Sequence, residues 1–121
     1  MTTRRSSAYP GERTYRIEFT SDSWDVLTRA HASGEVPSAR PYLERMTTKD
    51  TGRGLRYVVS CPESVTYNLR DFFVRHEQAT GVLVNAALAR GQNDPNVARE
   101  YAASVHGRNE VEGALGVATR Q

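Results

Sequence analysis

The sequence predicts an α+β fold: a small antiparallel sheet of about three strands, in β-α-β-β-α order, packed against helices, with additional C-terminal helices. Three observations support this fold class. Apolar and polar residues alternate with period two near the N-terminus, which indicates a half-buried strand. A turn-rich stretch at residues 49–54 separates two further strand-like segments. From residue 62 onward, apolar residues recur at three- and four-residue spacing, which indicates helices.

The first strand and the first helix are adjacent in the sequence. Residues 14–20 alternate aromatic or β-branched residues with charged ones, so they are predicted to form a strand with one face in the core. The Ser-Asp-Ser sequence at residues 21–23 offers helix N-caps, and its acidic residue suits the first turn of a helix. We expect this helix to end at Gly34.

A β-hairpin is predicted in the middle of the chain. Its strands are residues 42–48 and 55–60, and the connecting residues 49–54 are rich in turn formers. The loop is longer than the tight two-residue type. Alternate residues of the second strand, beginning with Leu55, are expected to point inward.

The longest helix is predicted to begin at Cys61-Pro62-Glu63, because proline suits the first helical position. Gly81 is a candidate C-cap, but residues 82–89 are also consistent with a longer helix or with the start of another one. Gly91 ends the helical pattern. The apolar stripe of this helix comprises Val65, Leu69, Phe72, Phe73 and His76.

Asp94 and Pro95 predict the start of a last helix, as its N-cap and its first helical residue. We expect this helix to end at Gly107. Its narrow apolar stripe comprises Val97, Tyr101 and Val105.

The chain has 121 residues, which indicates a single domain. We assign that α+β domain to residues 13–107. Residues 1–12 are small, polar and basic and are predicted to form a flexible basic N-terminal arm. Residues 108–121 are weakly apolar and contain two glycines, so they are predicted to form a C-terminal tail or a frayed helix.

Charge is distributed unevenly along the chain. The formal net charge is only +2, but residues 1–16 and residues 40–57 each carry +3. Residues 17–39 carry −3. The near-neutral total therefore conceals two basic segments on either side of an acidic one.

The composition excludes several classes of protein. The longest strongly apolar run, Val82-Leu83-Val84, is too short to cross a bilayer. One cysteine cannot form an internal disulfide. The first residues lack the apolar stretch of a secretory signal. We therefore expect a soluble, cytoplasmic protein with no membrane association.

The leading functional hypothesis is a small non-enzymatic protein that acts by binding another protein or by self-association, as an assembly subunit or a small regulator or inhibitor. The helical region has more apolar surface than a single core-facing stripe requires, so part of it is expected to face a partner. The alternative is that the C-terminal helices cover this surface internally. The residues predicted for the interface are Phe72, Phe73, His76, Val82 and Leu83.

The second hypothesis is nucleic-acid binding by the basic segment at residues 40–57. Basic side chains can contact phosphates, and tyrosine rings can stack on bases. The alternative is a solvated hairpin whose charges prevent edge-to-edge aggregation. The residues predicted for this function are Arg40, Arg45, Lys49, Arg53, Arg56, Tyr42 and Tyr57.

The third hypothesis is a small enzyme with a thiol nucleophile at Cys61, placed where a helix dipole can activate it. A nucleophile also needs a nearby base, and no spacing identifies His31 or His76 as that base. The alternative is a small buried cysteine at the end of a strand. The histidines do not have metal-ligand spacing and no phosphate-binding loop is present, so we assign no catalytic residue and expect neither a metal nor a cofactor.

Overall fold

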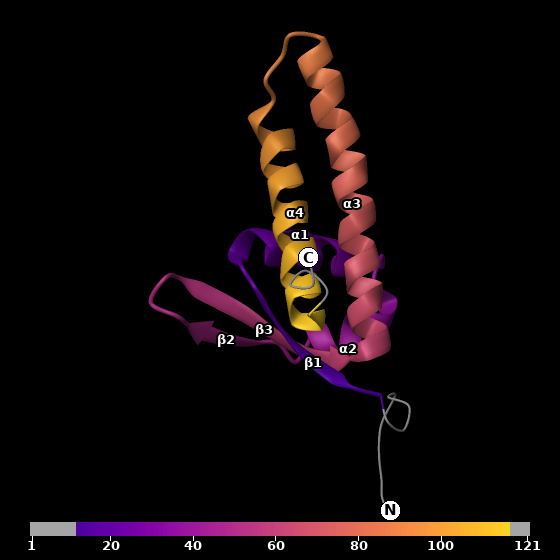
Figure 1. Ribbon diagram of the computed structural model, residues 1–121, viewed down its shortest axis with the longest axis vertical. Helices are drawn as coiled ribbons and strands as arrows, with labels where there is room; N and C mark the ends of the chain where they lie inside the picture. The colour runs from indigo at the N-terminus through magenta and orange to yellow at the C-terminus, as the bar shows by residue number, and fades with distance from the viewer. Residues whose placement is uncertain (1–11, 117–121) are drawn as a thin grey trace, which may run out of the picture.

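The computed structural model describes residues 12–116 and confirms the predicted α+β fold class (Figure 1). Apart from Glu12, the predicted basic arm lies outside the described residues, as do residues 117–121 of the predicted tail. In chain order, the elements are β1 (Thr14–Phe19), α1 (Ser21–Ala32), a 3-10 helix (Pro37–Ala39), α2 (Arg40–Leu43), β2 (Thr47–Asp50), β3 (Leu55–Pro62), α3 (Glu63–Ala89) and α4 (Pro95–Leu115).

The sheet has the strand order β1-β3-β2, and both pairings are antiparallel. In its register, Ile17 lies opposite Val59 and Phe19 lies opposite Tyr57. Directly paired residues point to the same face of a sheet, so these side chains share one face. Ile17, Phe19 and Val59 are buried there. This inner face is the one that the helices cover.

Aromatic side chains join the helices to the inner face of the sheet. Phe73 of α3 is fully buried, and its ring centroid lies 6.0 Å from that of Phe19 and 5.1 Å from that of Phe72. Trp24 of α1 stacks on Tyr57 of β3, with ring centroids 5.6 Å apart and ring planes 6° apart. The core therefore lies between the sheet, α1, the first half of α3 and the part of α4 nearest the sheet.

The predicted strand at residues 42–48 is wrong over most of its length. Residues 37–43 are helical instead, and β2 begins only at Thr47. Pro37 and Pro41 occupy early positions of the two short helices, where the fixed φ of proline is helical and its missing N–H would be unpaired anyway. The two prolines therefore favour short helices in this segment, although the alternation of the sequence indicates a strand.

β2 is consequently shorter and later than predicted. It includes Lys49 and Asp50, which the sequence placed in the loop, and all its residues are exposed. The hairpin loop is limited to residues 51–54. The Thr51 hydroxyl and the Thr51 N–H both donate to the carbonyl of Gly54, which closes this loop.

α3 starts with Pro62 as its N-cap rather than as its first helical residue. Gly81 does not end the helix, which continues to Ala89, so the alternative of a longer helix is confirmed. Gly91 adopts the left-handed conformation, with a φ of 70°, and its N–H donates to the carbonyl of Leu88. With 27 residues, α3 is about 40 Å long.

α4 begins as predicted, because the Asp94 carboxylate accepts hydrogen bonds from the backbone N–H groups of Asn96 and Val97. The predicted end at Gly107 is wrong, since the helix continues to Leu115. The predicted apolar stripe is wrong as well, because Val97, Tyr101 and Val105 are exposed or half-buried. The residues that α4 buries are Ala103, Ser104, Gly107, Val111 and Glu112.

α3 and α4 form an antiparallel hairpin that projects beyond the sheet and α1 (Figure 1). The half nearest the sheet contributes to the core through residues such as Phe73 and Val111. The other half surrounds the loop between the two helices. We call this half, residues 78–101, the distal hairpin.

Candidate functional site

Three of the residues predicted to bind nucleic acid lie on or beside the short helix α2. Arg40 forms an ion pair with Glu44, with Nε and Oε2 3.0 Å apart. Arg45 is exposed just after the helix. Tyr42 is half-buried and packs against the core. Its ring is therefore only partly accessible as a stacking platform.

The other four predicted residues lie on the β2–β3 hairpin. Lys49 and Arg56 are paired across the two strands, and Arg53 is exposed in the loop. Tyr57 points to the inner face, where its ring stacks on Trp24. The structure thus separates the basic groups of the hairpin from both predicted aromatic partners.

The outer face of the sheet gathers a smaller set of charges. The register places Arg16, Glu18, Lys49 and Arg56 on this face. Glu18 pairs with both Arg16 and Lys49, at 3.2 Å and 3.3 Å. Three basic side chains therefore lie on the same face as one carboxylate, which leaves the outer face positively charged.

The residues predicted for a protein interface divide into two groups. Phe72 and Phe73 are buried within the chain itself, where they pack in the core. Val82 and Leu83 are 67% and 55% exposed. Of these two pairs, only the second is exposed in the described part of the chain.

His76, the remaining predicted interface residue, lies half-buried between α3 and α4. Its Nδ1 contacts the Ser104 hydroxyl, and its Nε2 lies 3.3 Å from Glu100 Oε2. Serine, histidine and glutamate in this order resemble a hydrolase triad. Ser104, however, is fully buried, and its hydroxyl donates to the backbone carbonyl of Glu100. A substrate cannot reach that hydroxyl, so these side chains serve to join the two helices.

Glu100 also connects the hairpin to α1. Its Oε1 lies 2.9 Å from a terminal guanidinium nitrogen of Arg29. The hydrogen bond with Glu100 raises the pKa of Arg29, although partial burial acts in the opposite direction. The base of the distal hairpin is thereby anchored to α1 by charge-assisted hydrogen bonds.

Cys61 lies at the end of β3 and is buried. Burial raises the pKa of its thiol, and the hydrogen bond with the Thr66 hydroxyl only partly offsets this effect. A raised pKa disfavours the thiolate, which is the nucleophilic form. The environment of Cys61 is thus typical of a structural cysteine.

The three histidines are paired with carboxylates on other elements. His31 Nε2 lies 3.6 Å from Glu44, and His106 Nδ1 lies 2.6 Å from Asp22. His76 contacts Glu100, as described above. Within residues 12–116, no group of three or more metal-ligating side chains comes together.

A network of ion pairs fixes α4 against α3 close to the sheet. Glu112 is nearly buried, and it accepts hydrogen bonds from Arg70 Nε at 2.8 Å and from Arg108 at 3.1 Å. Arg108 also pairs with Glu77. The hydrogen bond with Glu77 raises the pKa of Arg108, against the opposing effect of partial burial. The network alternates positive and negative groups, so every charge in it is compensated.

Glu110 of α4 caps the start of α1. Its carboxylate accepts hydrogen bonds from the Thr20 hydroxyl at 2.8 Å, from the Thr20 N–H at 3.3 Å and from the Ser23 hydroxyl. Burial raises the pKa of Glu110, although these hydrogen bonds lower it. The contact fixes α4 to the N-terminus of α1, where a helix dipole favours negative charge.

The distal hairpin is the part of the described chain where apolar side chains are most exposed. Seven of the eight residues at 82–89 are apolar, Asn85 being the exception, so α3 is apolar on all sides here. Leu88 is 60% exposed, in addition to Val82 and Leu83. A helix of this kind is normally buried, yet α4 covers only one side of it (Figure 1). No helix among the described residues has the length and apolar character to cross a membrane.

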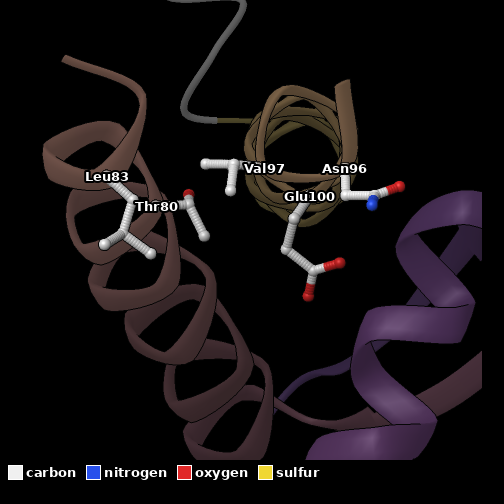
Figure 2. A pocket seen from close by; sticks show the side chains of 5 residues that line it. All are labelled: Thr80, Leu83, Asn96, Val97 and Glu100. Atoms are coloured by element: carbon white, nitrogen blue, oxygen red, sulfur yellow. The ribbon is translucent and has the colours of Figure 1, made fainter. Parts of the chain in front are cut away.

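A hollow of about 240 Å³ opens between the two helices of the distal hairpin. Figure 2 shows Leu83 and Thr80 on α3 facing Val97 on α4, with Glu100 pointing into the space beside them. The lining is mainly apolar, and its carboxylate is already paired with Arg29 and His76. The hollow is therefore suited to an uncharged side chain of a partner.

Comparison with known proteins identifies no relative of this chain. No protein-family model, no curated protein and no solved structure matches it. The class of protein is therefore defined by its own architecture. It is an α+β body that carries a projecting antiparallel helical hairpin. Among the features of the described chain, the exposed apolar surface of that hairpin is the strongest candidate for a functional site.

Proposed function

We propose that this chain is a non-enzymatic interaction protein, an assembly subunit or a small regulator, which binds an apolar helix of another protein chain through the distal hairpin. The observation that carries this proposal is the run of apolar residues at 82–89, in which Val82, Leu83 and Leu88 are exposed on a helix that projects beyond the sheet. Exposed apolar surface of this kind is costly in water and is characteristic of binding sites.

The distal hairpin offers what helix docking requires. An amphipathic helix binds by laying its apolar face into a groove, where side chains at three- and four-residue spacing act as anchors. The hollow between Leu83 and Val97 can receive one such anchor. The anchoring of Glu100 to Arg29 and His76 keeps the groove in place before a partner arrives, which lowers the entropic cost of binding.

Site-specific photo-cross-linking in cells tests this function. A photoreactive amino acid replaces Val82, and a control carries it at Tyr67, which is also exposed on α3 but close to the sheet. We expect a discrete cross-linked protein from position 82 and none from position 67. Adding Leu83→Glu should abolish that product, and Asn85→Glu, which introduces the same charge on the same helix, should affect it less.

Two results would count against a binding role for the distal hairpin. One is equal cross-linking from positions 82 and 67, since that pattern reports random collisions. The other is a product from position 82 that persists unchanged in the Leu83→Glu background. Circular dichroism of each variant verifies that the helices are retained. This result is expected for Leu83→Glu and Asn85→Glu because both side chains are exposed.

A second candidate function is nucleic-acid binding through the outer face of the sheet. The observation in its favour is that Arg16, Lys49 and Arg56 share that face with one carboxylate. Since Tyr57 is stacked on Trp24, such binding would rest on phosphate contacts and would not depend on base sequence. Fluorescence anisotropy with labelled oligonucleotides should then show an affinity that falls steeply with salt and is lost on Arg53→Glu with Arg56→Glu. Binding that is unaffected by added salt and by the double substitution would eliminate this function.

A further inference from the structure

One face of α3 is covered near the sheet and left open farther along. Near the sheet, the side-chain amide of Asn68 donates to the Ser38 hydroxyl at 2.9 Å. Phe72, one turn farther along the same face, is buried in the core together with residues of the segment at 36–39. This segment therefore covers the first half of the face. The cover ends where Glu35 borders a small hollow beside Arg75.

Beyond that point, the same face of α3 continues as an apolar stripe. Ala79, Val82, Leu83 and Ala86 follow at i, i+3, i+4 and i+7, the spacing of a seam between two helices. The first three are exposed and Ala86 is half-buried. We call these four residues the exposed α3 stripe. The apolar pattern of a contact face therefore continues along α3 beyond the part that the segment at residues 36–39 covers.

A positive charge lies at each end of the exposed α3 stripe. Arg75 precedes Ala79 by one turn on the same face of α3, and Arg90, the C-cap of the helix, follows Ala86 by one turn. Arg90 Nε donates a hydrogen bond to the side-chain oxygen of Gln92. Both arginines are exposed, and within residues 12–116 neither forms an ion pair with a carboxylate. Residues 78–93 contain no acidic residue. The fifteen-residue separation places the two charges about 22 Å apart along the helix.

From this arrangement we infer that the occupant of the distal hairpin is an amphipathic helix of a different protein, with acidic residues at both ends of its apolar face. The inference rests on the proposed function and specifies its partner. Apolar side chains of the partner would pack on the exposed α3 stripe and enter the hollow at Leu83. Its acidic residues would pair with Arg75 and Arg90, which gives the contact a preferred register and excludes basic helices.

A second copy of this chain fits the site poorly. If two exposed α3 stripes pair in antiparallel orientation about a point between Val82 and Leu83, Arg75 of one copy lies opposite Arg90 of the other. In parallel orientation, Arg75 lies opposite Arg75. Like charges are juxtaposed in both cases, which disfavours self-association through this face.

Designed peptides test the inference with the full chain. Two helical peptides of about five turns share the same apolar face, with contacts at i, i+3, i+4 and i+7. One carries Glu at both ends of that face and the other carries Lys. Isothermal titration calorimetry should show binding of the acidic peptide about three- to tenfold tighter than that of the basic one, the range expected for two exposed ion pairs. The difference should shrink as salt is added.

Charge reversal provides the matched control. In the double variant Arg75→Glu with Arg90→Glu, the preference should invert, so that the Lys peptide binds more tightly. Arg99→Glu changes the same charge on an exposed residue of α4, outside the stripe, and should leave the preference unchanged. Val82→Glu should weaken both peptides.

The outcomes separate this inference from the function on which it rests. Equal binding of the two peptides, weakened by Val82→Glu, overturns the acidic-partner inference and leaves the hairpin as a binding surface. The inference is also overturned if light scattering shows that the wild type is a dimer and that Val82→Glu dissociates it. The occupant of the distal hairpin is then a second copy of this chain. Binding of neither peptide, together with the absence of a cross-link at position 82, overturns both proposals.

Discussion

The aromatic ring of Phe73 on α3 occupies the space that any side chain at position 107 of α4 would need. A Cβ added to Gly107 would overlap three atoms of the Phe73 ring, closer than Cβ atoms approach other groups in real proteins. Phe73 is fully buried, and its ring also packs against Phe72 and Phe19, so it has little room to move. The absence of a side chain at Gly107 thus sets how closely α4 approaches α3.

We therefore expect Gly107→Ala to destabilise the fold. Overpacking of a filled core costs about 1–3 kcal/mol, which exceeds the gain of up to about 1 kcal/mol from replacing glycine by alanine in a helix. Gly113→Ala is the matched control, because it lies in the same helix and a Cβ there meets nothing within 4 Å. Urea denaturation should show a lower free energy of unfolding for Gly107→Ala and a higher one for Gly113→Ala. Equal stabilisation by both substitutions would show that Phe73 does not constrain α4.

The same glycine shows what the sequence could and could not predict. Two local signals were reliable, because the alternation in β1 and the Asp94-Pro95 pair each describe an element that is present. The start of α1 is one residue earlier than its predicted caps, since Thr20 is the N-cap and Ser21-Asp22-Ser23 lies inside the helix. The sequence predicts a helix end at Gly107 because glycine is common at the C-terminal ends of helices. Its actual role depends on a residue of another helix, 34 positions earlier in the chain, and no local pattern contains that information.

The candidate site was predicted in part for a similar reason. Val82 and Leu83 were identified from the surplus of apolar residues alone. The sequence alone does not identify Ala79, Ala86 or the flanking charge of Arg90 as part of the site. Their face of α3 becomes recognisable only in the structure, where the segment at residues 36–39 packs on the first half of that face. Signals for them existed in the three- and four-residue spacing after Phe72, but the spacing does not say where the chain's own cover ends.

The ion-pair network around Glu112 should contribute measurably to stability. Glu112→Gln keeps the shape of the side chain but places an amide donor next to Arg70 or Arg108, which are themselves donors. Loss of a hydrogen bond to a charged group costs about 1.5–3 kcal/mol. Glu44→Gln removes an exposed partner of Arg40 and His31 and should cost less than about 1 kcal/mol. Thermal denaturation of both variants checks this ranking, and equal costs would mean that the network is no stronger than a surface ion pair.

Cys61 should be unreactive in the folded protein. It is 1% exposed, and burial raises the pKa of its thiol, so both access and the thiolate fraction are low. Because it is the only cysteine in the chain, a thiol reagent reports on this site alone. We expect labelling by a chromogenic disulfide reagent to be slow in buffer and to rise with urea in parallel with the loss of helical circular dichroism. Fast, complete labelling with the circular dichroism unchanged would instead identify Cys61 as an accessible thiol.

Glu110 should make stability depend on pH in the acid range. Burial raises the pKa of Glu110 in the folded state, so the folded protein holds this proton more tightly than the unfolded chain does. Its contribution is therefore fully present below the ordinary pKa of glutamate, about 4.3, and is lost as pH rises through the raised pKa. Glu110→Gln removes this titration. Relative to the wild type, the free energy of unfolding of Glu110→Gln should increase with pH across that window. The increase should be about 1.4 kcal/mol for each tenfold difference in the proton affinity of Glu110 between the folded and the unfolded chain.

Asp22, which faces the same cluster, provides a control of opposite sign. Burial raises the pKa of Asp22, but its hydrogen bonds with Thr20, His106 and Ser23 together outweigh burial, and its pKa lies below the usual value. Its contribution is present above the ordinary aspartate pKa and is lost as pH falls through the lowered one. Asp22→Asn should thus be destabilising near neutral pH and progressively less so in acid, the reverse of Glu110→Gln. Urea midpoints measured over a pH series for the two variants and the wild type should diverge in opposite directions. Curves that stay parallel for Glu110→Gln and the wild type would show that this carboxyl group titrates alike in the folded and unfolded chain.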